Sequence, residues 1–322
     1  MSGGGGLEGA ELARRLRERD LTAAPAVLNL LESGTGRSRE AARELLAGLA
    51  PAALGREAPG HVIGVTGPPG VGKSSLLSRL VAHWRSGERS VAVLAVDPTS
   101  RRSGGALLGD RARIEVDPTD PGVFIRSTAA GTRLGGLAPA TRAAAAALAS
   151  AFDVVVIETV GVGQSETEVA DVADTVAVVV QPASGDVLQF LKAGIMEVPD
   201  VLVVTKSDLG RIATRAVSDL RAALRALGAD AEVVAVSALP PGAGIAELGA
   251  ALDRHRDSID LPARRAAARR LHALADFATE HGERGLRALG GRRQAERWLA
   301  EQDPALDVRA LTEALESRAA SA

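Results

Sequence analysis

The sequence predicts an α/β fold in which a mostly parallel sheet is covered by helices on both faces, with helical extensions at both ends of the chain. Between about residues 62 and 236, short runs built almost entirely of Val, Ile, Leu and Ala alternate with segments of helical periodicity. Continuous apolar strands separated by helices are typical of a sheet buried on both faces. Outside this region the apolar residues recur only at helical spacing.

The predicted elements fall into three regions. Residues 1–58 are expected to form an N-terminal helical region, because leucines such as Leu12 and Leu16 recur at helical spacing among charges. A Gly- and Pro-containing linker then leads into a central region, 59–261, and residues 262–322 are expected to be helical again. Within the central region an Ala-rich helix is expected at Thr141–Ala151, and the strands are expected at Val62–Val65, Val91–Val96, Val154–Ile157, Val176–Val180, Val201–Val204 and Val233–Val236.

Composition narrows the class of protein. The 322 residues are 46% hydrophobic, which is enough for a large core, and the formal net charge of −2 gives no electrostatic reason to expect a nucleic-acid partner. The absence of cysteine excludes disulfides and thiolate metal sites, and the five histidines show no ligand spacing. No apolar run approaches the roughly 20 residues that cross a bilayer. We therefore expect a soluble cytoplasmic protein without a membrane or nucleic-acid partner.

A phosphate-binding motif joins the first expected strand to a helix. It matches the pattern GxxxxGK[ST], in which glycines let backbone N–H groups surround a polyphosphate and the helix N-terminus adds partial positive charge. The expected phosphate contacts are Gly67, Pro68, Pro69, Gly70, Val71, Gly72, Lys73, Ser74 and Ser75. In this pattern Lys73 bridges the β- and γ-phosphates, and the Ser74 hydroxyl is a ligand of Mg²⁺. The motif predicts a P-loop NTPase fold that binds a nucleoside triphosphate.

Carboxylates follow the later strands. Asp97 and Glu158 end expected strands and Asp110 lies in a Gly-rich segment, so all three are expected near the bound Mg²⁺ and the attacking water. Magnesium keeps several waters, so one or two carboxylates are expected to bind it directly and the others through water. Together with Lys73, these three carboxylates are the candidate catalytic residues.

The base is expected to be read by two later segments. Asp208 in the tetrapeptide 205–208 can accept two hydrogen bonds from the N1–H and 2-amino edge of guanine, which adenine lacks, so it selects GTP over ATP. The stem of Lys206 is expected to lie against the base, with Thr205 opening the motif. Ser237 and Ala238 follow the strand Val233–Val236, and a backbone N–H there would bind guanine O6.

These residues lie in segments that resemble the MeaB/ArgK family of P-loop GTPases, accessory proteins of adenosylcobalamin-dependent acyl-CoA mutases such as methylmalonyl-CoA mutase. The resemblance spans nearly the whole chain. It rests on GVTGPPGVGKSSL (64–76), AVDPTSRRSGGALLGDRARI (95–114), FIRSTAAGTRLGG (124–136), VIETVGVGQSE (156–166) and QPASGDVLQFLKAGIMEVPDVLVVTKSD (181–208). Three positions depart from the family pattern: Thr205 replaces the usual asparagine, Phe190 a glycine and Arg111 a lysine.

The resemblance implies a GTPase of the metallochaperone type, with GTP or GDP and Mg²⁺ as cofactors, that protects and reactivates its mutase and gates adenosylcobalamin loading from an adenosyltransferase. Segments 97–114, 158–166 and 181–192 would sense the γ-phosphate, and the third would pass that state to the mutase. The switch residues implied are Gly161, Gly163, Gln164, Gly185, Asp186 and Gln189. The C-terminal helices resemble the family's dimerisation arm, which implies a homodimer; a helical cap on the chain's own domain is the alternative.

Other functions remain open at this point. An ATP-dependent kinase of a transport system would fit the imperfect Thr205 motif, and a nucleotide-binding scaffold without significant turnover would fit the phosphate loop alone. A metal-insertion GTPase for hydrogenase or urease is disfavoured, because such proteins need a Cys/His cluster. Hydrolysis is expected to be slow without a partner, since no obvious activating arginine stands beside the site.

Overall fold

The computed structural model describes residues 6–33, 35–97, 114–129, 137–159, 168–182 and 199–321. The chain divides into two compact units, one formed by Pro59–Ser258 and the other by Met1–Ala58 together with Ile259–Ala322. The helical ends, which the sequence treats as two regions, thus fall in one unit. Within the described ranges, no helix combines the length and the apolar character that crossing a bilayer requires.

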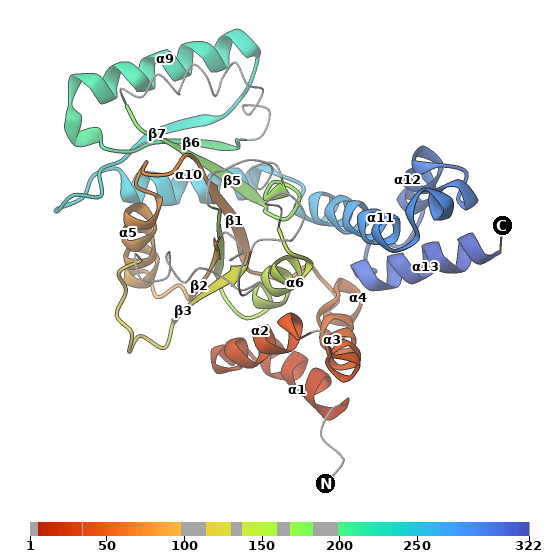
Figure 1. The fold of residues 1–322 in the computed structure, drawn as a ribbon. Coiled ribbons are helices and arrows are strands. Elements are labelled where there is room, and N and C mark those ends of the chain that lie inside the picture. The colour runs from red at the N-terminus through yellow and green to blue at the C-terminus, as the bar shows by residue number, and fades with distance from the viewer. Residues whose placement is uncertain are drawn as a thin grey trace, which may run out of the picture. The chain divides into compact units, whose positions relative to one another are not determined.

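The central unit is built on a seven-stranded sheet with the strand order β3-β2-β4-β1-β5-β6-β7 (Figure 1). Every pairing between these neighbours is parallel, which confirms the predicted α/β fold. Six strands correspond to the apolar runs of the sequence, whereas β3 was not predicted. The strands are β1 (His61–Thr66), β2 (Val91–Asp97), β3 (Val123–Ala129), β4 (Val154–Thr159), β5 (Thr175–Val180), β6 (Val201–Val204) and β7 (Glu232–Ala235).

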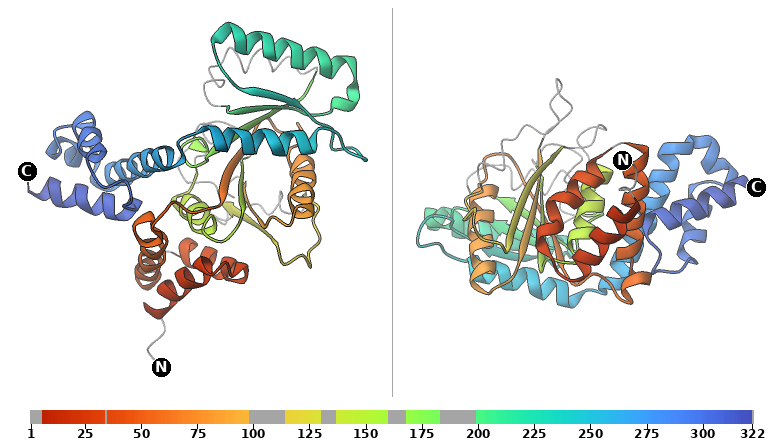
Figure 2. Two further views of the ribbon diagram at one scale, coloured as in Figure 1. Left: turned by 180° about the vertical axis from the view of Figure 1, so that it is seen from behind. Right: turned by 90° about the horizontal axis from the view of Figure 1, so that it is seen from below.

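Helices cover both faces of this sheet (Figures 1 and 2). On one face, α5 (Lys73–Ser86) and α10 (Ile245–Ser258) pack against alternate strand residues, so that Ile63 and Val65 of β1 share a core with Leu248 of α10. The other face carries α6 (Pro139–Leu148) and α9 (Arg211–Leu227). Because each strand buries both of its faces, the strands read as continuous apolar runs.

A buried hydrogen-bond network joins the amino-terminal ends of β1 and β5 to α10. The imidazole Nε2 of His61 lies 2.8 Å from Thr175 Oγ1, which lies 2.9 Å from His255 Nδ1. His255 Nε2 lies 3.1 Å from Asp200 Oδ1. Since a carboxylate only accepts, His255 donates from Nε2, the Thr175 hydroxyl then donates to His255 Nδ1, and His61 donates from Nε2 to Thr175. This leaves His61 Nδ1 as an acceptor facing Asp253 Oδ1 at 3.7 Å, too far for a hydrogen bond.

The position of His61 disfavours its charged form. The side chain is fully buried, and this desolvation lowers the pKa of the imidazole, although the nearby carboxylates of Asp253 and Asp174 act in the opposite direction. The folded protein therefore holds His61 neutral at the foot of β1, the strand that carries the phosphate loop at its other end.

The helical unit has contributions from both ends of the chain. Its N-terminal part packs α1 against α3 so closely that a Cβ on Gly9 would lie 2.0 Å from the Ala41 carbonyl oxygen. The N-terminal elements are α1 (Gly6–Arg17), η1 (Leu21–Ala23), α2 (Ala24–Glu32), α3 (Gly36–Leu49) and α4 (Pro51–Leu54), and the C-terminal ones are α11 (Leu261–Ala288), α12 (Arg292–Ala300) and α13 (Val308–Ala320).

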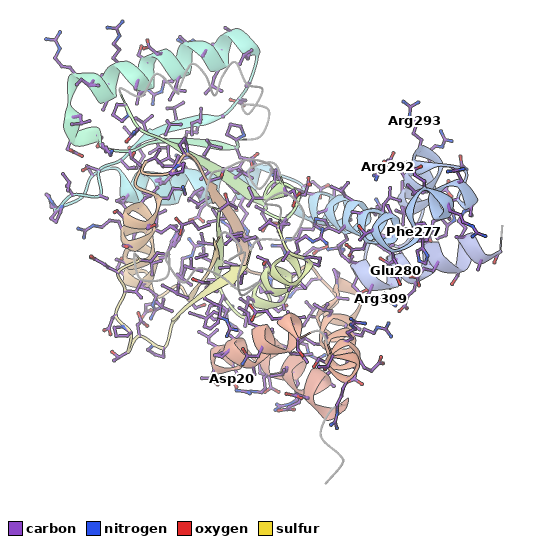
Figure 3. All side chains as sticks on the ribbon, in the orientation of Figure 1. Asp20, Phe277, Glu280, Arg292, Arg293 and Arg309 are labelled. Atoms are coloured by element: carbon purple, nitrogen blue, oxygen red, sulfur yellow. The ribbon has the colours of Figure 1, made fainter. Side chains whose placement is uncertain are left out.

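Hydrogen bonds and an ion pair connect these parts of the helical unit. The Ala52 N–H donates to the Ala305 carbonyl at 3.2 Å, and Arg269 forms an ion pair with Glu57 at 2.7 Å in which each side chain is only 14% exposed. The C-terminal helices also enclose a core of their own around Phe277, which is fully buried (Figure 3). Helix α11 is interrupted at Gly282, whose φ of 59° and ψ of −160° are non-helical.

Candidate functional site

The phosphate loop connects the carboxyl end of β1 to the amino end of α5. Its three glycines have positive φ angles, 144° at Gly67, 77° at Gly70 and 99° at Gly72, which other residues adopt only with strain. Gly67 is also required for space, because a Cβ there would lie 2.1 Å from the Val179 carbonyl oxygen on β5. The loop can follow this path only with the glycines that the motif supplies.

Lys73 begins α5 and points back into the loop. Its side chain is buried, and Nζ donates to the carbonyl oxygens of Gly67 at 2.7 Å and Pro68 at 3.2 Å. The ammonium group thus lies inside the curve of the loop, next to the N-terminus of a 14-residue helix. A cation and a helix N-terminus at one point form a site for an anion such as a phosphate group.

Ser74 and Glu158 meet beside this loop. Glu158 lies near the end of β4, opposite Val65 of β1, and is 3% exposed. Its Oε1 accepts a hydrogen bond from the Ser74 hydroxyl at 3.3 Å. A hydroxyl and a carboxylate are the hard oxygen ligands that Mg²⁺ prefers, so these two side chains fit the expected metal. Behind them, Thr159 donates to Thr66 at 2.8 Å and ties β4 to β1.

One predicted site residue is described by its backbone alone, and others lie outside the described ranges. Asp97 ends β2 in register with Ala129 of β3, but its side chain lies outside the described part of the chain. Outside it altogether lie Asp110, Arg111, Gly161, Gly163, Gln164, Gly185, Asp186, Gln189 and Phe190. The assignment of Asp97 and Asp110 to the metal site, and of six residues of this set to the switch loops, stays a prediction; Arg111 and Phe190 are two of the departures from the family pattern.

Thr205 connects the expected base-binding segment to the phosphate loop. It follows β6 directly, is 5% exposed, and its Oγ1 donates to the Val71 carbonyl at 2.7 Å and to the Val180 carbonyl at 3.1 Å. The hydroxyl therefore braces the middle of the phosphate loop. Thr205 makes this contact at the position where the resemblance places an asparagine.

The remaining base-site residues lie at the carboxyl ends of β6 and β7. Lys206 has a left-handed φ of 54°, and its ammonium donates to the side-chain oxygen of Gln181, just after β5. Asp208 lies in the short helix η4 (Ser207–Leu209), and its Oδ1 accepts a hydrogen bond from the Ser237 hydroxyl at 2.7 Å. The structure therefore brings together the two segments, 205–208 and 237–238, that the sequence assigns to the base.

Two residues of the site were missed by the sequence analysis. Gln181 holds Lys206, and Arg79 on α5 donates from Nε to the Ala238 carbonyl oxygen at 2.9 Å. Neither was assigned to the site individually, although Gln181 begins the matched segment 181–208. Gln181 directly follows an apolar run, which is the one local signal that placed it at the carboxyl edge of the sheet. Arg79 carries no such signal, because its role depends on a contact made across the fold.

Relatives of the chain are described mainly as GTPases. A putative GTPase of Pyrococcus abyssi is 45% identical over 201 residues, which are 62% of this chain and 59% of that protein. A putative GTPase of Caulobacter vibrioides is 41% identical over 80% of each chain. A mitochondrial methylmalonic aciduria type A homolog of Caenorhabditis elegans is 44% identical over 48% of this chain and 39% of that protein. The chain thus spans about three fifths of the length of the archaeal relatives it matches.

A solved structure and a family model extend these similarities. The crystal structure of a LAO/AO transport system kinase aligns with a TM-score of 0.59 at 28% identity, covering 94% of this chain and 98% of that one. The model of the family described as methylmalonyl Co-A mutase-associated GTPase MeaB matches residues 24–286, which include the phosphate loop, Glu158 and both base segments. This chain therefore belongs to the MeaB family of P-loop NTPases.

Proposed function

We propose that this protein binds GTP with Mg²⁺ and hydrolyses it to GDP and phosphate. The observation that carries the proposal is the grouping of Lys73, Ser74 and Glu158 at the carboxyl ends of β1 and β4. These side chains supply a cation for phosphate oxygens and oxygen ligands for a metal. The family description and the relatives described as GTPases support hydrolysis as the activity.

Each residue has a defined task in this proposal. The Lys73 ammonium exchanges its carbonyl partners, Gly67 and Pro68, for phosphate oxygens, and the N–H groups of the loop bind the same anion. Bound Mg²⁺ would offset phosphate charge, held by Ser74 and by Glu158 directly or through water. Glu158 also orients the attacking water. Asp97 and Asp110 are proposed as further ligands on the basis of the sequence alone.

Selectivity for guanine is assigned to Asp208. Its carboxylate offers acceptors to the N1–H and 2-amino groups of guanine, and the Ser237 hydroxyl fixes its orientation. The rival function is an ATP-dependent kinase, which the similarity to the LAO/AO transport system kinase favours. Adenine presents no matching pair of donors to Asp208, and this argues for GTP.

Calorimetry separates the two functions. We expect the wild-type chain to bind GDP much more tightly than ADP in the presence of Mg²⁺, and Lys73→Ala to lose both. The matched control is Arg225→Met, which changes an exposed arginine of α9. Tighter binding of ADP than of GDP would refute the assignment of Asp208 and favour the kinase, whereas GDP binding without any turnover of GTP would favour a scaffold.

The partner that we propose is an adenosylcobalamin-dependent acyl-CoA mutase, methylmalonyl-CoA mutase above all. The family description and the name of the nematode relative support it. In this role the GTPase cycle protects and reactivates the mutase and gates cofactor transfer from an adenosyltransferase. We expect a cognate mutase to raise the GTP turnover of this protein, with Glu158→Gln as the control that stays slow. Unchanged turnover together with no complex on size-exclusion chromatography would contradict the partner.

We also propose that α11–α13 mediate a homodimer. The alternative has support in the structure, because these helices bury Phe277, Leu299 and Leu315 within their own unit. Multi-angle light scattering on the full chain decides between them. A mass of twice 32.9 kDa is expected, and a monomer in the nucleotide-free, GDP-bound and GTP-bound states would leave α11–α13 as a cap of their own unit.

A further inference from the structure

The loop that carries Ala238 is weakly supported by packing. It follows Ser237, which exchanges two backbone hydrogen bonds with Ala243 at 3.0 and 3.1 Å. Between them the chain runs through exposed residues, and Leu239 is 62% exposed. An N–H group can recognise a base only if its peptide plane has a fixed orientation. Because burial does not fix this loop, hydrogen bonds must fix it.

Both peptide planes that flank the Ala238 Cα are fixed by a hydrogen bond. The plane before it is held through the Ser237 carbonyl, which accepts from the Ala243 N–H. The plane after it is held through the Ala238 carbonyl, which accepts from Arg79 Nε at 2.9 Å. Because a peptide unit is planar, one bond to each carbonyl restricts the two dihedral angles of Ala238. Arg79 is therefore the residue that attaches this loop to α5.

The peptide unit between Ala238 and Leu239 is also connected to Asp208, the residue proposed to read guanine. At its far end, the Leu239 N–H donates to Ser237 Oγ at 3.3 Å, and Ser237 Oγ donates to Asp208 Oδ1 at 2.7 Å. A carboxylate only accepts, so every donor in this series points from Arg79 toward Asp208. A guanidinium at the start polarises the amide that follows, and aligned hydrogen bonds strengthen one another.

We infer that Arg79 is a positioning residue for guanine recognition, acting on Asp208 through the peptide 238–239 and the Ser237 hydroxyl. The inference rests on the proposed function, in which Asp208 reads the base. It adds that α5, the helix that starts at the phosphate loop, also sets the orientation of the base-reading carboxylate. In this proposal Arg79 acts through the Ala238 carbonyl and not on the nucleotide, so its loss affects selectivity rather than phosphate binding.

The nucleotide test compares Arg79→Met with Arg79→Lys and with the control Arg225→Met. The probes are GDP, IDP and pyrophosphate, since IDP lacks the 2-amino group that Asp208 accepts from. Loss of one charge-assisted hydrogen bond predicts about tenfold weaker GDP binding in Arg79→Met. IDP is expected to weaken less, pyrophosphate not at all, and Arg79→Lys to recover part of the loss with its single ammonium group. An unchanged ratio of GDP to IDP affinity, or an equal loss for pyrophosphate, would overturn the inference.

Hydrogen exchange tests the same connection without nucleotide. In Arg79→Met, amide exchange across residues 237–243 is expected to accelerate severalfold, and in Arg225→Met to stay as in the wild type. Unchanged exchange in Arg79→Met would overturn the relay whatever the nucleotide data show. If the wild type preferred ADP while exchange still accelerated, the proposed function would fail and the relay from Arg79 to Asp208 would stand as a structural link.

Discussion

Replacing Thr205 by valine tests the hydrogen bond that connects the base segment, residues 205–208, to the phosphate loop. Valine keeps the branched shape but removes the hydroxyl that donates to the Val71 carbonyl at 2.7 Å. The Val180 carbonyl keeps a donor, because it also accepts from the Thr205 N–H at 2.9 Å. The Val71 carbonyl is therefore the group that loses its donor in Thr205→Val. Leaving one buried carbonyl without its donor costs about 1–3 kcal/mol. At the lower end of that range, the variant is expected to bind nucleotide about fivefold more weakly.

The assay is a titration of wild type and Thr205→Val with GDP and with ADP. Because the Val71 contact supports the loop that holds phosphates, which both nucleotides carry, both affinities are expected to fall by the same factor. Thr205→Asn restores binding, since an amide also donates. A loss confined to GDP would show that Thr205 acts on the base, and unchanged binding of both nucleotides would refute the brace.

Three further changes are expected to act differently. Asp208→Asn should shift preference toward xanthosine nucleotides, because an amide can donate to the xanthine 2-carbonyl; no gain in XDP affinity by calorimetry would remove Asp208 from the base site. Glu158→Gln should retain GDP binding but lose most GTP turnover in a phosphate-release assay, since the carboxylate proposed to orient water is gone, and near wild-type turnover would reassign that role. His61 should make stability depend on pH, because burial lowers the pKa of its imidazole in the folded state below the unfolded value near 6.5. Between the folded and the unfolded pKa, the unfolded chain binds more protons than the folded one. The free energy of unfolding therefore decreases as pH falls below about 6.5. Melting temperatures of His61→Gln should consequently fall less between pH 7 and 5.5 than those of the wild type, and parallel curves would contradict this.

The elements that apolar runs could predict are the buried ones. The unpredicted β3 carries Arg126, Ser127 and Thr128 in succession, and among the described residues it pairs with β2 alone, at the edge of the sheet. The other edge strand, β7, keeps an apolar run and was predicted, so the missing signal in β3 is its polar second half, which breaks the continuous pattern that revealed the other six strands.

The phosphate loop could be predicted because its chemistry depends on residues adjacent in sequence. The contacts that hold the base segments could not, since Arg79 and Ala238, or Thr205 and Val71, meet only after the sheet has formed. The histidines show the same limit. Their spacing indicates nothing, yet the fold joins His61 and His255 through the Thr175 hydroxyl.

The division of the chain into units has a consequence for synthesis. The unit Pro59–Ser258 interrupts the helical unit in sequence, so the ribosome completes the sheet before it makes α11–α13. Glu57 and the Ala52 amide emerge early, but their partners Arg269 and Ala305 are translated more than 200 residues later. Since domains tend to fold as they leave the ribosome, the unit Pro59–Ser258 can fold before α11–α13 are available to pack with the N-terminal helices.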